Sequence, residues 1–183
     1  MKKVLIAVLA PALLAAPVAL AQATGEPSAQ PARSSAAEFI EKAGKGGMFE
    51  VLSSDLALKR AMDAKVKDFA KRMTTDHRAS NDKLVSTLQS AQLPPPPTGL
   101  DPEQQEIMDT LSTASGRAFD RAYLDAQVKA HEDAVQLFST YAKEGDNPEL
   151  KSFAQQVLPT LEDHLKHVQT FEGASPASTG TSR

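Results

Sequence analysis

Three of the four histidines in this chain lie on the apolar faces of three separate predicted helices, and imidazole is a common metal ligand. They are His77 in the stretch 66–88, His131 in the stretch 124–138 and His164 in the stretch 150–168. In each stretch apolar residues recur at steps of three and four, which places them on one helical face with the histidine. If these helices pack as one bundle, the three rings meet at its centre, where polar groups need hydrogen-bond partners or a metal ion.

A fourth candidate ligand, Glu50, lies in a stripe of small residues on a helix expected over 35–61. Small side chains allow another helix to approach closely, and the carboxylate would then be partly buried. Counted from helix turns near residues 63 and 146, Glu50 and the three histidines all lie about 20–27 Å along their helices. The sequence therefore predicts a mid-bundle metal site made of Glu50, His77, His131 and His164. Bulkier residues define competing faces on this helix, so a position of Glu50 on a flank in water stays open.

Three imidazoles and one carboxylate suit a single transition metal ion, namely iron, zinc, manganese or copper. Nearby acids are expected to orient the rings by hydrogen bonds, and the candidates are Asp76, Glu132, Asp133 and Asp163. The alternative is a hydrogen-bonded polar layer without a metal, because a single buried histidine is most often a core residue with satisfied hydrogen bonds. His167, one turn beyond His164, is expected on the flank and outside the site.

Composition excludes several other kinds of chemistry. The chain has no cysteine, so disulfides, thiolate metal sites and thiol nucleophiles are excluded. A net charge of −3, no tryptophan and two tyrosines argue against nucleic-acid binding. The serines lack the elbow motif of a catalytic triad, and the stretch GKGG at 44–47 lacks P-loop spacing and a preceding strand. We therefore expect no catalytic residues, and we interpret the glycines as a place of close helix packing or a bend.

The N-terminus has the pattern of an export signal. Lys2 and Lys3 precede an apolar run at 4–20, and Ala19-Leu20-Ala21 supplies small residues for cleavage before Gln22. We expect residues 1–21 to be a signal peptide, 22–35 a disordered linker, 36–172 the folded domain and 173–183 a disordered tail. The cleaved protein is then periplasmic or secreted.

The sequence pattern of the folded segment predicts helices throughout. Besides the helix at 35–61, we expect helices from 63 or 64 to 92, at 102–113, at 116–144 and from 148 onward, the last kinked at Pro159. The run Pro94–Pro97 predicts a stiff, extended connector. Residues 66–73 resemble residues 150–157, which makes the second and the last helices equivalent members of two hairpins. The predicted fold is an all-α, ferritin-like four-helix bundle of two helical hairpins, joined by a long Pro-rich connection with a short extra helix.

Four segments resemble a widespread family of exported bacterial domains of unknown function, often labelled outer-membrane proteins. They are FIEKAGKGGMFE at 39–50, VKDFAKRMTTDH at 66–77, GRAFDRAYLDAQVKAHEDAVQLF at 116–138 and NPELKSFAQQVLPTLEDHL at 147–165. The resemblance implies a ferritin-like four-helix bundle and implies no settled activity. Ferritin-like di-iron proteins carry Glu-x-x-His on two helices. Here Thr74 and Leu161 stand where those glutamates would be, which argues against a bridged di-iron centre.

We therefore expect an exported periplasmic helical bundle that acts as a non-catalytic binding module in the envelope or in stress survival, with an unknown protein or a small ligand as its partner. The alternative is a metalloprotein whose mid-bundle site has redox or metal-storage activity. Membrane contact is expected to be peripheral at most. Apolar residues outside the core stripes (Leu56, Ile107, Leu111) are compatible with a homodimer without requiring one.

Overall fold

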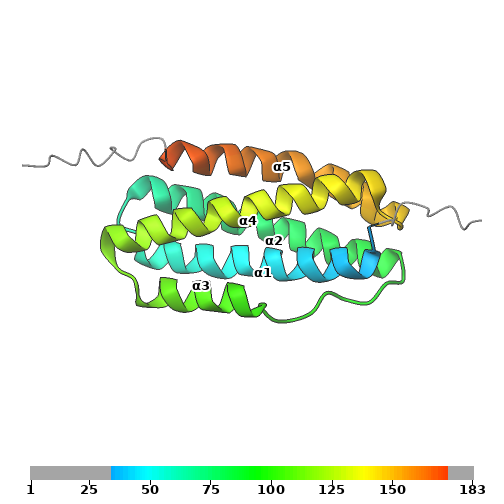
Figure 1. Ribbon diagram of the computed structural model, residues 1–183, viewed down its shortest axis with the longest axis horizontal. Coiled ribbons are helices and arrows are strands. Elements are labelled where there is room, and N and C mark those ends of the chain that lie inside the picture. Colours follow the sequence, from blue (N-terminus) through cyan, green and yellow to red (C-terminus); the bar gives the residue numbers. More distant parts are fainter. Residues whose placement is uncertain (1–33, 173–183) are drawn as a thin grey trace, which may run out of the picture. The chain divides into compact units, whose positions relative to one another are not determined.

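The computed structural model describes residues 34–172, which form five helices (Figure 1). These are α1 (Ala36–Arg60), α2 (Ala64–Ser90), α3 (Pro102–Thr113), α4 (Gly116–Glu144) and α5 (Pro148–Glu172). The helix bounds predicted from the sequence agree with them to within two residues. The predicted signal peptide, the linker up to residue 33 and the tail at 173–183 lie outside the described residues.

The helices pair as two antiparallel hairpins. α1 packs along α2 and α4 packs along α5, while α1 also contacts α4 and α2 contacts α5, which closes the bundle (Figure 1). The short helix α3 lies against α1 and α4, after the extended Pro-rich connector that follows α2. The predicted all-α bundle of two hairpins with one extra helix is confirmed.

Local sequence signals explain where several helices begin. Asp101 accepts a hydrogen bond from the Gln104 backbone N–H at 2.8 Å, and the Gln104 side chain accepts one from the Asp101 N–H at 3.1 Å, which is a capping box. Asn147 likewise caps α5 by accepting from the Leu150 N–H at 2.9 Å. Helix α5 continues through Pro159 without a break, because a proline removes only one donor and the rest of the helix is packed in the bundle.

Two glycines of α1 mark close approaches by other segments. A Cβ at Gly44 would lie 2.5 Å from Cβ of Pro96 in the connector, so the connector can rest on α1 only where there is no side chain. A Cβ at Gly47 would lie 2.0 Å from Oδ1 of Asn81 on α2. The close packing predicted for the glycine stretch is therefore confirmed at Gly44 and Gly47.

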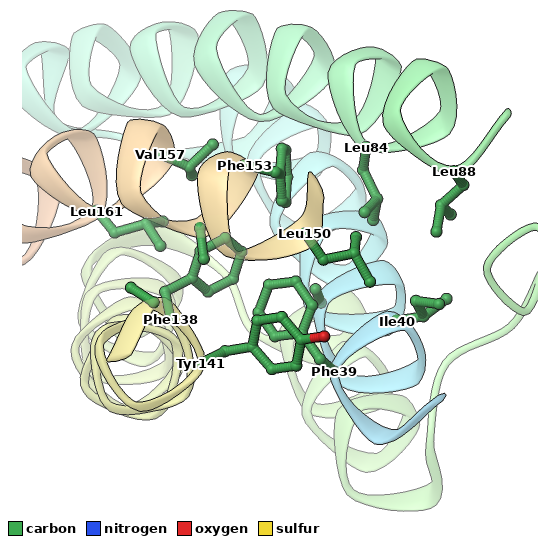
Figure 2. Close-up of a cluster of buried hydrophobic side chains, with 13 residues drawn as sticks. Phe39, Ile40, Leu84, Leu88, Phe138, Tyr141, Leu150, Phe153, Val157 and Leu161 are labelled. Atoms are coloured by element: carbon green, nitrogen blue, oxygen red, sulfur yellow. The ribbon is translucent and has the colours of Figure 1, made fainter. Parts of the chain in front are cut away.

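The buried apolar residues form two clusters along the bundle. One lies at the end where α1 begins and α4 ends, and Figure 2 shows its side chains converging from α1, α2, α4 and α5. In it the ring of Phe39 stacks on Tyr141 with centroids 4.1 Å apart. The other cluster includes Ala57, Phe69, Met73, Phe119 and Tyr123. Buried polar residues from all four long helices lie between the clusters, so the core is interrupted by a polar layer.

Helix α3 changes the environment of two residues that the sequence placed outside the core. Leu111 is fully buried and Ile107 packs against the second cluster, because α3 lies on α1 and α4 rather than in solvent. Leu56 is also partly buried against the same cluster. These residues therefore give no support to a dimer surface. Among the helices described here, none combines the length and the apolar character needed to cross a membrane.

Candidate metal centre

The polar layer contains Glu50 from α1, His77 from α2, His131 from α4 and His164 from α5. All four are at most 6% exposed. One nitrogen of each of the three imidazoles lies within 4.8 Å of the corresponding nitrogen of the others. The structure thus brings the three histidines together from three helices, as the similar depth of these residues along their helices suggested.

Hydrogen bonds determine which nitrogen of His131 faces its neighbours. Nδ1 lies 2.9 Å from the backbone carbonyl oxygen of Gln127, which can only accept, so Nδ1 carries a proton and donates to this oxygen. The lone pair is then on Nε2, which lies 3.4 Å from Nε2 of His77. His131 is therefore fixed with a coordinating nitrogen directed at the neighbouring imidazole.

His164 is oriented by a carboxylate. Its Nε2 donates to Oδ2 of Asp76 at 2.8 Å, and its Nδ1 is buried with no hydrogen-bond partner among the described residues. Asp76 is in turn 3.4 Å from Nε of Arg72. A carboxylate that holds one imidazole nitrogen while the other stays free is the usual arrangement behind a metal-binding histidine.

The other acids predicted to orient the rings lie elsewhere. Asp163 pairs with Arg72 at 2.5 Å, Asp133 pairs with Lys129 at 2.9 Å, and Glu132 is exposed. Asp76 is therefore the member of that set that contacts a ring of the cluster. His167 packs against Phe69 outside the layer, which agrees with its predicted position on the flank.

Glu50 lies beside the cluster, next to Nδ1 of His131. Its Oε1 is 3.5 Å from Nδ1 of His131, the nitrogen that already bonds to the Gln127 carbonyl. Its Oε2 is buried and has no hydrogen-bond partner in the described part of the chain. The carboxylate does not belong to the group of converging ligand atoms that the three histidines form. The burial predicted for Glu50 is observed, whereas its place among the ligand atoms remains a prediction.

Burial sets the protonation states of the layer. It lowers the pKa of His77 well below the ordinary value, and the neighbouring rings of His131 and His164 lower it further. Burial also lowers the pKa of His164 to about 4, although the hydrogen bond to Asp76 opposes this shift. Both rings are thus neutral at pH 7 and keep a lone pair for a metal. Burial raises the pKa of Glu50 above its ordinary range, against the effects of His131 and Gln127.

The spacing of the nitrogens is close to that of a metal site. Two nitrogens bound at about 2.0–2.1 Å to a tetrahedral ion lie about 3.4 Å apart, the same as the His77–His131 separation. The widest pair, within 4.8 Å, would have to close by up to about 1.4 Å. Three imidazoles without a thiolate are ligands that suit copper and zinc.

Sequence reasoning missed the polar residues that continue the layer toward the second apolar cluster. Gln127 donates to Oγ of Ser53 at 3.2 Å, and the hydroxyls of Ser54 and Tyr123 are 2.9 Å apart. Gln127 precedes His131 by four residues, so its position on the same helical face was a signal that could have identified it.

The fold and the layer together define a four-helix-bundle protein with three imidazoles clustered in its core. The chain belongs to the DUF4142 family, a domain of unknown function whose model matches residues 21–171. No curated protein matches the chain in sequence.

Several solved structures share this fold. CopM in its Cu(II)-bound form matches with a TM-score of 0.66 and 18% identity, over 78% of this chain and 98% of CopM. CopM in a Ag-bound form matches with a TM-score of 0.64 and 19% identity, over 77% and 97% of the two chains. A DUF305 fragment from Deinococcus radiodurans has a TM-score of 0.64 and 18% identity, over 75% of this chain and 94% of the fragment. At these identities the likeness establishes the fold alone.

Proposed function

We propose that this protein is a non-catalytic copper-binding module of the bacterial envelope, with one ion held by His77, His131 and His164. The observation that carries the proposal is the convergence of three buried imidazoles, in which acceptors engage Nδ1 of His131 and Nε2 of His164 while Nδ1 of His164 is left without a partner in the described chain. A merely structural polar layer would satisfy these nitrogens, yet Nδ1 of His164 is buried without a partner in the described chain.

Two considerations favour copper over the other candidate ions. Copper(II) binds a given set of nitrogen ligands more tightly than the other divalent ions of its series, including zinc. The fold is also that of CopM, which has been solved with Cu(II), Cu(I) and Ag bound. Manganese prefers oxygen ligands, and the cluster offers nitrogen alone.

The proposed role is non-catalytic because of the surroundings of the histidine cluster. The long helices enclose the three rings between two apolar clusters, and each ring is at most 6% exposed. Such a site suits holding an ion more than turning over a substrate, since His131 and His164 are fully buried and out of reach of a reacting molecule. Export to the periplasm follows from the N-terminal pattern and belongs to the same proposal.

The test is metal content and affinity of the full chain, recovered from the periplasm without chelator or polyhistidine tag. We expect about one copper ion per chain, lost in His77→Gln and in His131→Gln, since each variant removes one of three ligands. His167→Gln is the matched control, because this histidine packs on Phe69 outside the cluster and should leave the copper content unchanged. Equal copper in all variants, or none in the natural sequence, would overturn the proposal.

A further inference from the structure

A cavity leads from the surface of the bundle to the histidine cluster. It has a volume of about 680 Å³ and is lined by residues of all five helices. Its wall includes exposed side chains such as Glu41 and Glu103, and also the buried Glu50 and His77. His131 and His164 do not line it. An ion entering here would therefore meet Glu50 and His77 before the other two rings.

The wall of the cavity is open beside Gly46 of α1. A Cβ at Gly46 would meet no atom within 4 Å, whereas one at Gly47 would run into the Asn81 side chain. All three residues line the cavity. Gly47 thus makes room for the Asn81 side chain, whereas the space beside Gly46 holds no side chain.

The outer part of the cavity has more carboxylates than amines. Its exposed acids are Glu38, Glu41, Glu103 and Asp133, and its lysines are Lys42, Lys45 and Lys129. Each lysine is paired with one or two of these carboxylates, at 2.6–3.2 Å. Because the carboxylates outnumber the lysines, the mouth of the cavity has a net negative charge, which raises the local concentration of cations.

Glu50 is a buried residue at the inner end of the cavity. Its side chain is 5% exposed, and its Oε2 has no hydrogen-bond partner in the described chain. A buried carboxylate oxygen without a partner costs about 1–3 kcal/mol of folding free energy, so its retention calls for a reason. A cation passing from the mouth to His77 would supply the missing partner.

We infer that this cavity is the loading route for hydrated divalent ions, and that Glu50 binds the ion before the three histidines do. The inference rests on the proposed function of the histidine cluster. A carboxylate oxygen replaces a water ligand of Cu²⁺ or Zn²⁺, so that the ion loses its water in steps. Ag⁺ is a soft ion with little preference for oxygen, and its loading has no need of this carboxylate.

The test measures loading rates and affinities separately. The metal-free full chain is mixed with Cu²⁺ or Ag⁺ in a stopped-flow instrument, and a competing chelator gives the equilibrium affinity. In Glu50→Gln we expect Cu²⁺ loading at least about tenfold slower, with Ag⁺ loading and both affinities changed by less than about threefold. Glu162→Gln is the matched control, since Glu162 is an exposed carboxylate of α5 that does not line the cavity.

A second variant tests the route without altering a charge. Gly46→Leu places a side chain in the open part of the cavity and should slow loading of both ions while leaving the affinities unchanged. Unchanged loading rates in both variants would overturn the route while leaving copper binding intact. A loss of affinity for both ions in Glu50→Gln, with normal rates, would show that Glu50 supports the bound site and would also overturn it. A natural chain that takes up neither ion would refute the proposed function itself.

Discussion

Asp76 is the residue that most directly controls the orientation of a ring in the cluster. It accepts from Nε2 of His164 at 2.8 Å and thereby keeps Nδ1 free. Replacing such a carboxylate behind a metal ligand typically costs 10- to 100-fold in metal affinity. We therefore expect Asp76→Asn to weaken copper binding by about 10- to 100-fold, measured by competition with a chelator.

A neighbouring carboxylate offers a matched control for this prediction. Asp163 also pairs with Arg72, at 2.5 Å, but it makes no hydrogen bond to His164. Asp163→Asn should leave copper affinity within about twofold, because an exposed ion pair contributes little. Equal losses in Asp76→Asn and Asp163→Asn would mean that the charge of the surface, rather than the orientation of the ring, matters.

At the residue scale, the sequence predicted which histidines meet and left their orientation open. Steps of three and four and a similar depth along each helix were enough to predict that His77, His131 and His164 lie together. The direction of each ring depends on partners that only the packed structure provides, such as the Gln127 carbonyl behind His131. For the same reason the sequence could place Glu50 in the layer but could not show that it contacts Nδ1 of His131 rather than the centre of the cluster.

At the scale of elements, the glycines of α1 allow a test of how the connector is docked. Gly44→Ala places a methyl group against the ring of Pro96 and should destabilise the fold by about 1–3 kcal/mol, as overpacking does. Gly46→Ala meets no atom within 4 Å and should stabilise it by about 0.5–1 kcal/mol through higher helix propensity. Urea unfolding of the metal-free variants measures both changes. If both variants were more stable than the natural chain, the connector would have moved away from position 44 without a cost in free energy.

Helix ends and hairpin pairing were accessible to sequence reasoning because local signals determine them. Asp101 and Asn147 are caps that act within their own first turn, so no tertiary information was needed to find them. Leu111 is different, because its burial depends on where α3 docks. Nothing in the twelve residues of α3 specifies that it lies on α1 and α4, and its single fully buried side chain is visible only in the packed bundle.

On the scale of the whole molecule, a buried polar layer takes the place of apolar packing in the middle of the core, which lowers the stability of the fold. Two apolar clusters stabilise the bundle, and the layer between them holds three imidazoles and one carboxylate at most 6% exposed. Buried polar groups favour the neutral form, since burial disfavours charge. The whole fold is therefore coupled to the protonation of this layer, and pH should affect its stability more than the small net charge of −3 suggests.

The pH dependence has a definite sign. The pKa of His164 is about 4 in the folded chain and near 6.5 when unfolded, so between these values the unfolded chain binds more protons. The contribution of His164 to the free energy of unfolding is therefore fully present above pH 6.5. It is lost as the pH drops toward 4, by up to about 3 kcal/mol. The lowered pKa of His77 acts in the same direction.

Urea unfolding of the metal-free protein at several values between pH 4 and pH 7 measures this loss. We expect the decline in unfolding free energy to be shallower in His164→Gln, because glutamine takes up no proton in either state. His167→Gln should keep the full decline, since that ring lies outside the layer. If His164→Gln declines as steeply as the natural chain, then the buried imidazole does not link folding to pH, and surface carboxylates account for the acid sensitivity.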